Sequence, residues 1–259
     1  MECQRRMRFN NPVMKWNGLA GLALALAGAV CQAGEWAVVP RHETRAGAAG
    51  GFELERRETR VAEFVEYLNE AKVAEYPETA QILRGMGGGY ASKAGAGSQA
   101  VAEVTAAEAE AYCRWRSQAE GRLVRLPTEA EWETAARGGV DGAPYPWGWG
   151  GDPAALARFD AEGPAPSGGR YPANGFGLYD MAGNLYEWCA AGPAGFPAGQ
   201  RAARGGSWAE HAPAFLEVAH RQFFPVDYRG RDVGFRPLRE PASRKGSQGD
   251  EFRQGTGGF

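Results

Sequence analysis

The chain has 259 residues, which is enough for one large domain or two small domains with a substantial core. Its formal net charge of −2 indicates neither a basic surface for nucleic acid nor an acidic tail. Glycine and proline are abundant, at 38 and 16 residues, which favours turns and irregular segments and argues against a helical bundle.

An apolar run, Leu19–Val30, lies near the N-terminus. It is short for a bilayer span, and small residues follow it. We interpret residues 1–33 as a secretory signal peptide that is cleaved after Ala33. The mature protein is then expected to be periplasmic or secreted, without a transmembrane segment. A lipoprotein anchored at Cys31 is the alternative, but Val30 does not fit the small residue that normally precedes a lipidated cysteine.

Cleavage leaves two cysteines, Cys113 and Cys189. Export permits them to form a disulfide, because the compartment is oxidising. Two cysteines far apart in the sequence do not form a disulfide framework, however, and two buried thiols are an equal alternative. The sequence leaves the pairing open.

Residues 34–51 form a polar lead-in, and Phe52–Leu54 is predicted to be a short strand. A helix is expected after it, with Thr59 as its N-cap. This expectation depends on four apolar residues that recur at helical spacing: Val61, Phe64, Val65 and Leu68. The glycine-rich segment 84–97 matches no phosphate-binding motif and is predicted to be a surface loop.

Two further helices are indicated by capping boxes, in which a threonine precedes a glutamate by three residues. Thr105 and Glu108 mark the start of one helix, and Thr128 and Glu131 mark the start of the next. Regular periodicity is weak in residues 140–236, which contain mostly aromatic and glycine residues, so few regular ladders are expected there. The last twenty residues, 240–259, lack an apolar face and are predicted to be a disordered tail.

Five motifs follow one another along the chain: RLPTEAEWETAARGG, YPWGWG, NGFGLYDMAGNLYEWC, RGGSW and GFR. In this order and spacing they resemble the sulfatase-modifying-factor family, whose namesake is the formylglycine-generating enzyme. The resemblance covers about Phe52 to Arg236. It implies one compact α+β domain over residues 52–239, related to the C-type-lectin-like fold and with little regular secondary structure.

The resemblance also implies where catalysis takes place in the namesake enzyme. That enzyme binds copper(I) with two cysteines just after its RGGS motif, activates oxygen and oxidises a sulfatase cysteine. In register, these cysteines correspond to Glu210 and Phe215. A carboxylate and a phenyl ring cannot replace the soft thiolate ligands of copper(I), so copper-dependent formylglycine generation is not expected.

A calcium site is a second implication of the resemblance. The matching segment of the enzyme wraps one Ca²⁺, and the corresponding positions here are Asp180, Gly183, Leu185 and Glu187. Hard oxygen ligands on a flexible loop suit this ion, although both acids could instead be solvated or paired with arginines. The family's other calcium site is expected to be lost, because Arg158 stands where that site has an asparagine.

The segment around RGGSW suggests a pocket formed by Ser207, Trp208 and Arg221. Glu210 and His211 are adjacent there and could act as an acid–base pair. Simpler interpretations are open for each residue: a turn serine, an indole that plugs irregular backbone, an arginine that ties loops together, and polar residues left after catalysis was lost.

Three functions are compatible with these residues. The first is an exported accessory or binding protein, expected to be a monomer, whose pocket holds a peptide or small molecule. The second is a repurposed periplasmic oxidoreductase, similar to the pyoverdine-tailoring member of the family. The third, a true formylglycine-generating enzyme, is disfavoured by the missing cysteine pair. The sequence does not separate the first two, so whether the chain is an enzyme is left open.

Overall fold

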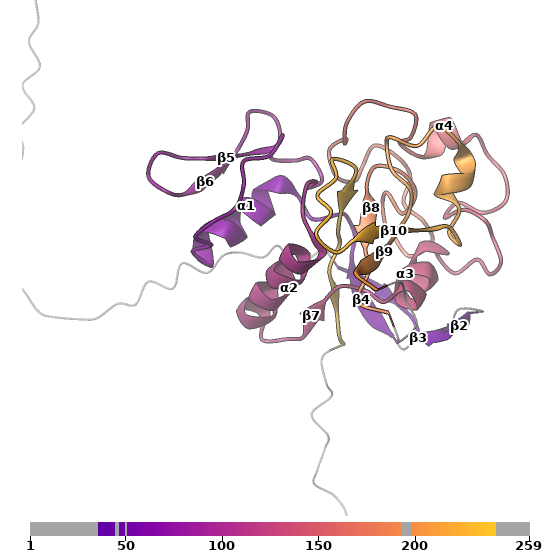
Figure 1. Ribbon diagram of the computed structural model, residues 1–259. Helices are drawn as coiled ribbons and strands as arrows, with labels where there is room; N and C mark the ends of the chain where they lie inside the picture. Colours follow the sequence, from indigo (N-terminus) through magenta and orange to yellow (C-terminus); the bar gives the residue numbers. More distant parts are fainter. Residues whose placement is uncertain (1–35, 45–46, 50, 193–197, 242–259) are drawn as a thin grey trace, which may run out of the picture. The chain divides into compact units, whose positions relative to one another are not determined.

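The computed structural model describes residues 36–44, 47–49, 51–192 and 198–241. The predicted signal peptide and all but the first two residues of the predicted tail lie outside this range. Helices alternate with short strands and long irregular connections (Figure 1), which confirms the expected α+β class with little regular secondary structure. The helical segments are α1 Val61–Glu70, α2 Ala106–Glu120, α3 Glu129–Ala136, α4 Pro153–Leu156 and the 3₁₀ helix η1 Pro213–Leu216.

Twelve strands form two four-stranded sheets and two hairpins within the described residues. The first sheet has the order β1-β4-β12-β7, and the second sheet has the order β10-β9-β8-β11. The strands are β1 Trp36–Val39, β2 His42–Thr44, β3 Gly47–Ala49, β4 Phe52–Glu55, β5 Ile82–Arg84, β6 Tyr90–Ser92, β7 Val124–Arg125, β8 Tyr186–Trp188, β9 Gln200–Arg204, β10 Arg221–Pro225, β11 Val233–Gly234 and β12 Leu238–Arg239.

The first sheet includes part of the segment predicted to be a lead-in. Strand β1 pairs antiparallel with β4, with Val39 opposite Phe52. Ala37 and Val39 are buried, whereas Val38 between them is exposed, as expected for a strand with one face on a core. The lead-in boundary at residues 34–51 is therefore wrong, and the folded domain begins at or before Trp36.

The second sheet lies in the half of the chain where few regular ladders were expected. Its strand β8 is buried at all three positions, so no alternation of polar and apolar residues marks it. Strand β9 buries Ala202 and Ala203, and alanine has a low strand propensity. These two properties explain why the sequence pattern did not indicate the sheet.

The helix predictions are confirmed, with one change of cap. Thr105 and Thr128 both accept a hydrogen bond in the expected capping boxes. Helix α1 begins one residue later than expected, because the backbone N–H of Arg60 donates to Glu63 at 2.8 Å. The predicted cap, Thr59, is buried, and its N–H donates to the carbonyl of Phe235 instead.

The glycine-rich segment predicted to be a loop is partly a hairpin. Strands β5 and β6 pair antiparallel, with Ile82 opposite Ser92. Ile82 and Tyr90 are buried, and they anchor the two strands in the core beside α1. Residues 85–89 between the strands are exposed, so the loop itself is as predicted.

Two apolar cores hold the helices against the sheets. The larger core packs α1 and α2 with residues of the second sheet, including Tyr186 and Trp188 of β8. The smaller core packs Trp132 of α3 against β1, β4 and β12. Figure 1 shows α2 beside β7 and α3 beside β9. Within the described ranges, no helix has the length and apolar character needed to cross a membrane.

A buried ion pair connects the two sheets. The guanidinium of Arg236, which follows β11, donates to both carboxylate oxygens of Glu187 on β8, at 2.8 and 2.6 Å. It also donates to the carbonyl of Glu55 on β4 at 3.1 Å and to the carbonyl of Tyr179 at 2.8 Å. Arg236 is 0% exposed and Glu187 is 1% exposed, so neither charge reaches water.

We predict that Arg236→Met lowers the free energy of unfolding by about 3–5 kcal/mol, because it leaves the Glu187 carboxylate buried without a counter-charge. Chemical denaturation followed by circular dichroism measures this loss. Adding Glu187→Gln to the Arg236→Met variant is expected to recover part of it, since a neutral amide oxygen still accepts from Trp132.

The exposed Arg170 provides the matched control. Arg170→Met is expected to change the free energy of unfolding by less than about 0.5 kcal/mol. An equal, small effect of both arginine substitutions would contradict a structural role for the ion pair.

Candidate functional site

The RGGSW segment leaves the second sheet through two glycines. Strand β9 ends at Arg204, and Gly205 and Gly206 follow with φ angles of 99° and 72°. A Cβ atom on Gly206 would lie 2.7 Å from the carbonyl oxygen of Phe215. Only glycine therefore allows this close approach of the two segments, which places residues 207–215 in a folded loop.

Glu210 and His211 do not form the predicted acid–base pair. The carboxylate of Glu210 accepts from the hydroxyl of Tyr186 at 2.7 Å. His211 is instead 2.7 Å from the carboxylate of Asp160 through Nδ1, and its side chain is 83% exposed. The two residues are adjacent in irregular backbone, where neighbouring side chains point in different directions.

Glu210 belongs to a group of hydrogen-bonded side chains that the sequence did not indicate. Tyr186 lies on β8, and its hydroxyl is 3.4 Å from Nε2 of His220, which directly precedes β10. The tyrosine has one proton, which it donates to Glu210, so His220 donates from Nε2 to the tyrosine oxygen. The result is a hydrogen-bonded chain, His220–Tyr186–Glu210. No sequence pattern indicated it, because strand pairing alone brings these three residues together.

Burial is the largest cause of the pKa shifts of His220 and Tyr186 in this set of hydrogen bonds. It lowers the pKa of His220, and the Glu210 charge opposes that effect. Burial and the hydrogen bond to Glu210 raise the pKa of Tyr186. Both shifts favour the uncharged forms of the histidine and the tyrosine at neutral pH.

The residues at the two copper-ligand positions offer no thiol. Phe215 packs edge-on against the His220 ring at 5.2 Å, and Glu210 is held by Tyr186. Cys113 and Cys189 are free and buried, and burial raises the pKa of both thiols. No reactive thiolate is therefore present in the described part of the chain.

The predicted calcium ligand Glu187 is already occupied. Arg236 donates to both of its oxygens, and the indole of Trp132 donates to Oε2 at 2.7 Å. Among the described residues, no group of three or more His, Cys, Asp or Glu side chains is placed to hold a metal ion. The contacts of this carboxylate therefore do not fit a calcium ligand.

The other three predicted calcium positions lie in a tight loop with its own hydrogen bonds. Asp180 accepts from the backbone N–H of Gly168 at 2.7 Å, and Leu185 donates its N–H to Glu58 at 3.2 Å. A Cβ on Gly183 would lie 2.3 Å from the carbonyl oxygen of Arg158. Calcium at these positions stays a prediction.

Buried acids surround this loop. Burial raises the pKa of Glu58 well above its usual range, and the nearby charges of Asp180 and Glu187 raise it further. Burial also raises the pKa of Asp180. The Arg236 charge and the hydrogen bond from Asn184 oppose the rise in the Glu58 pKa.

Arg158, which replaces an asparagine of the family's other calcium site, has a structural role. Its guanidinium donates to the carbonyls of Gly163 at 2.8 Å and Glu162 at 2.7 Å. Its own carbonyl accepts from the N–H of Asn184 at 2.8 Å. Arg158 thus ties residues 162–163 to the loop around Asn184.

The three predicted pocket residues are not together. Ser207 is fully buried, and its hydroxyl accepts from the N–H of Ala209 at 3.3 Å, as in a serine turn. Arg221 is mostly exposed and lies 3.7 Å from Glu129, outside the cavity. Only Trp208 lines a cavity of substantial size.

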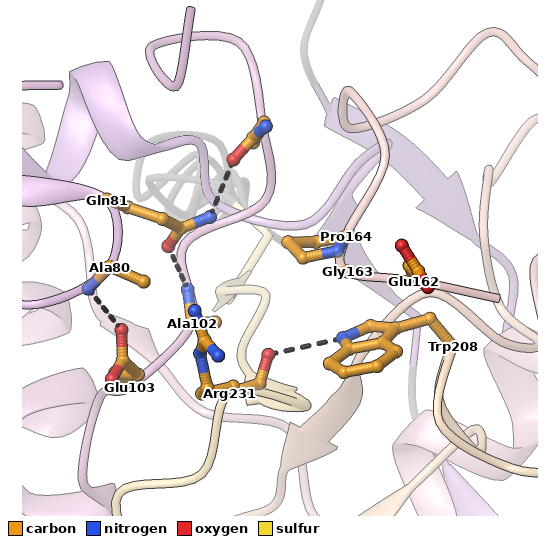
Figure 2. A pocket seen from close by; sticks show the side chains of 10 residues that line it. Ala80, Gln81, Ala102, Glu103, Glu162, Gly163, Pro164, Trp208 and Arg231 are labelled. Atoms are coloured by element: carbon orange, nitrogen blue, oxygen red, sulfur yellow. Dashed lines mark hydrogen bonds between the residues drawn. The ribbon is translucent and has the colours of Figure 1, made fainter. Parts of the chain in front are cut away.

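That cavity has a volume of about 520 Å³. Trp208 closes one side, and its indole N–H donates to the carbonyl of Arg231 at 3.2 Å. Figure 2 shows the indole on one side of the cavity, with Gln81 and Glu103 on the other side. The lining residues are Ala80, Gln81, Gln99, Ala102, Glu103, Glu162, Gly163, Pro164, Trp208 and Arg231.

Comparison with solved structures gives the same fold. The chain superposes on CarF with a TM-score of 0.62 at 21% identity, over 79% of this chain and 93% of that one. It superposes on PvdO from Pseudomonas aeruginosa with a TM-score of 0.60 at 23% identity, over 80% of this chain and 90% of that one.

Sequence relatives include both inactive and active proteins by name. The chain is 39% identical over 152 residues to inactive C-alpha-formylglycine-generating enzyme 2 of Bos taurus, which covers 52% of this chain and 48% of the relative. It is 44% identical over 105 residues to the formylglycine-generating enzyme of Thermomonospora curvata, which covers 35% of this chain and 32% of the relative. The chain thus matches half or less of the length of each of these relatives.

A family model described as the sulfatase-modifying factor enzyme 1-like domain matches residues 20–241. This match spans most of the chain and agrees with the motifs, the fold and the relatives. The chain belongs to the sulfatase-modifying factor family.

Proposed function

We propose that this protein is an exported binding protein that holds a peptide or small molecule in the cavity beside Trp208, without copper chemistry. The observation that carries the proposal is the pair of residues at the copper-ligand positions. Glu210 is hydrogen-bonded to Tyr186 and Phe215 packs on His220, so both positions are filled by side chains that cannot bind copper(I). The name of the bovine relative, an inactive enzyme, supports the same reading.

The cavity has the properties of a small ligand site. Its volume of about 520 Å³ lies within the range of pockets that hold small molecules. An indole ring provides the large apolar surface, and a few polar side chains surround it. Hydrogen bonds fix the walls in place, since Gln81 donates to Gln99 and Ala100 and accepts from Ala102.

Filling the cavity tests the proposal. Ala80 is exposed and lines the cavity, so Ala80→Trp is expected to weaken ligand binding at least about tenfold without disturbing the core. Isothermal titration calorimetry with a panel of capped tripeptides, one for each side chain at the central position, identifies the ligands and measures their affinities.

Ala107→Trp is the control, because Ala107 is an exposed helix residue outside the cavity. It is expected to bind the same peptides as the wild type. Binding that Ala80→Trp leaves unchanged would place the site elsewhere. Conversion of the cysteine in a sulfatase-motif peptide to formylglycine would overturn the proposal altogether.

A second candidate function is that of a repurposed tailoring enzyme, with acid–base chemistry at His220, Tyr186 and Glu210, which lie outside the cavity lining. The chain His220–Tyr186–Glu210 favours it, because a proton accepted at Nδ1 of neutral His220 can be passed on from Nε2 through the Tyr186 hydroxyl to the Glu210 carboxylate. Such a relay requires that His220 is neutral at neutral pH, and its lowered pKa meets that requirement.

We predict that His220 titrates below the usual range of histidine and that Glu210→Gln lowers its pKa further, because the carboxylate stabilises the imidazolium. Nitrogen-edited NMR measures both the pKa and the tautomer, which is expected to carry its proton on Nε2. Asp160→Asn is the control and should leave the His220 pKa unchanged, because Asp160 contacts His211 instead. A proton on Nδ1 of His220 would contradict the relay.

The contacts of Glu187 argue against calcium binding by the Asp180–Glu187 loop. Because Arg236 already occupies both oxygens of Glu187, we expect that a chelator leaves the melting temperature of the purified protein unchanged. Scanning calorimetry with and without the chelator measures this. A fall in melting temperature that added Ca²⁺ reverses would establish the calcium site and reassign Asp180, Gly183 and Leu185 as its ligands.

A further inference from the structure

Negatively charged side chains outnumber positively charged ones in the lining of the cavity. Two carboxylates, Glu103 and Glu162, and one guanidinium, Arg231, belong to its lining. Two neutral polar side chains also line the cavity: Gln81 has both ends of its amide in hydrogen bonds, and Gln99 accepts from Gln81 through its amide oxygen. The lining residues that can attract or repel a charged ligand are therefore these three charged residues.

Both carboxylates have oxygens available to a ligand. Glu103 accepts from the N–H of Ala80 through Oε2 at 2.6 Å, and its other oxygen has no partner among the described residues. The Glu162 carboxylate also has none in this part of the chain. The Glu162 backbone is nevertheless fixed, because its carbonyl accepts from Arg158 at 2.7 Å.

Trp208 presents an aromatic surface to the same space. It packs on Ala100, Ala102 and Leu185, and its N–H is occupied by the Arg231 carbonyl at 3.2 Å. The ring is therefore held on one side by the core and at its edge by a hydrogen bond, while the remaining surface lines the cavity (Figure 2). The π face of an indole attracts cations more strongly than that of any other side chain.

We propose that the cavity recognises an organic cation, a guanidinium or alkylammonium group, that lies on the Trp208 ring with its charge toward Glu103 and Glu162. This inference rests on the proposed binding function and names the chemistry of the ligand. Arg231, at the exposed side of the cavity, opposes a cation, so its removal should strengthen binding. An arginine or lysine side chain of a peptide and a free amine share this chemistry.

The test compares four probes by calorimetry: acetyl-Gly-Arg-Gly-amide, the same peptide with citrulline, the same peptide with glutamate, and agmatine. Citrulline has nearly the shape of arginine without its charge. We expect the arginine peptide to bind at least about tenfold more tightly than the citrulline peptide, and the glutamate peptide to bind weakest. Binding of agmatine as tight as that of the arginine peptide would identify a free amine as sufficient, whereas tight binding of the peptide alone would identify a peptide ligand.

Removal of a negative charge and removal of the positive charge are expected to change the affinity for the arginine peptide in opposite directions. Glu162→Gln should weaken binding of the arginine peptide about two- to fivefold, and Arg231→Gln should strengthen it by a similar factor. Trp208→Leu should remove most of the preference for arginine over citrulline. The exposed Trp149, which is outside the cavity, provides the control Trp149→Leu, which should have no effect.

The outcomes separate this inference from the proposed function. If the citrulline peptide binds as tightly as the arginine peptide and Ala80→Trp blocks both, the cavity binds ligands but the inference of a cation is wrong. The same conclusion follows if a neutral or acidic peptide from the panel binds and the two cationic probes do not. If no peptide of the panel and none of these probes binds, the proposed function fails as well.

Discussion

The structure depends on a positive charge that is completely removed from water. Such a guanidinium is tolerated only if a counter-charge and hydrogen-bond acceptors replace the lost water, because transfer of an ion into the interior costs several kcal/mol. Arg236 makes four hydrogen bonds, to the two oxygens of Glu187 and to the carbonyls of Glu55 and Tyr179. Because these partners belong to β8, to β4 and to the connection before β8, the first sheet, the second sheet and the irregular loop must take one arrangement.

A second set of hydrogen bonds, centred on Asn184, leads from the buried acids near this ion pair to the cavity. The side chain of Asn184 donates to Glu58 at 2.6 Å and accepts from the N–H of Ala165 at 2.9 Å. Its carbonyl accepts from the N–H of Trp208 at 2.9 Å, and its N–H donates to Arg158. One buried asparagine in a left-handed conformation thus joins the acidic cluster, the Trp208 loop and the segment that contains Glu162. The cavity walls are fixed by the same contacts that hold the core together, which preorganises them for a ligand.

Local signals in the sequence were sufficient for some features and insufficient for others. The starts of α2 and α3 were predictable because a capping box is a short-range pattern, complete within four residues. Strand β1 was missed because one buried face of four residues gives too little alternation to recognise. The chain His220–Tyr186–Glu210 was missed because sequence proximity favoured Glu210 and His211, whereas the pairing of β8, β9 and β10 placed residues 24 and 34 positions apart in contact.

The contacts of positions 210 and 215 differ from those of the loop around Asn184, and this difference shows how the family's fold can accept different side chains at positions 210 and 215. Phe215 is 37% exposed on η1, and neither position 210 nor position 215 belongs to an apolar core cluster of the described residues. Substitution there removes few packing interactions, so the stability of the domain imposes little constraint on which side chain is present. The loop around Asn184 is different, because Gly183 and Asn184 have backbone conformations and close contacts that few residues could adopt. The scaffold is therefore constrained at the loop and tolerant at positions 210 and 215, which is the condition under which one fold can host different functions.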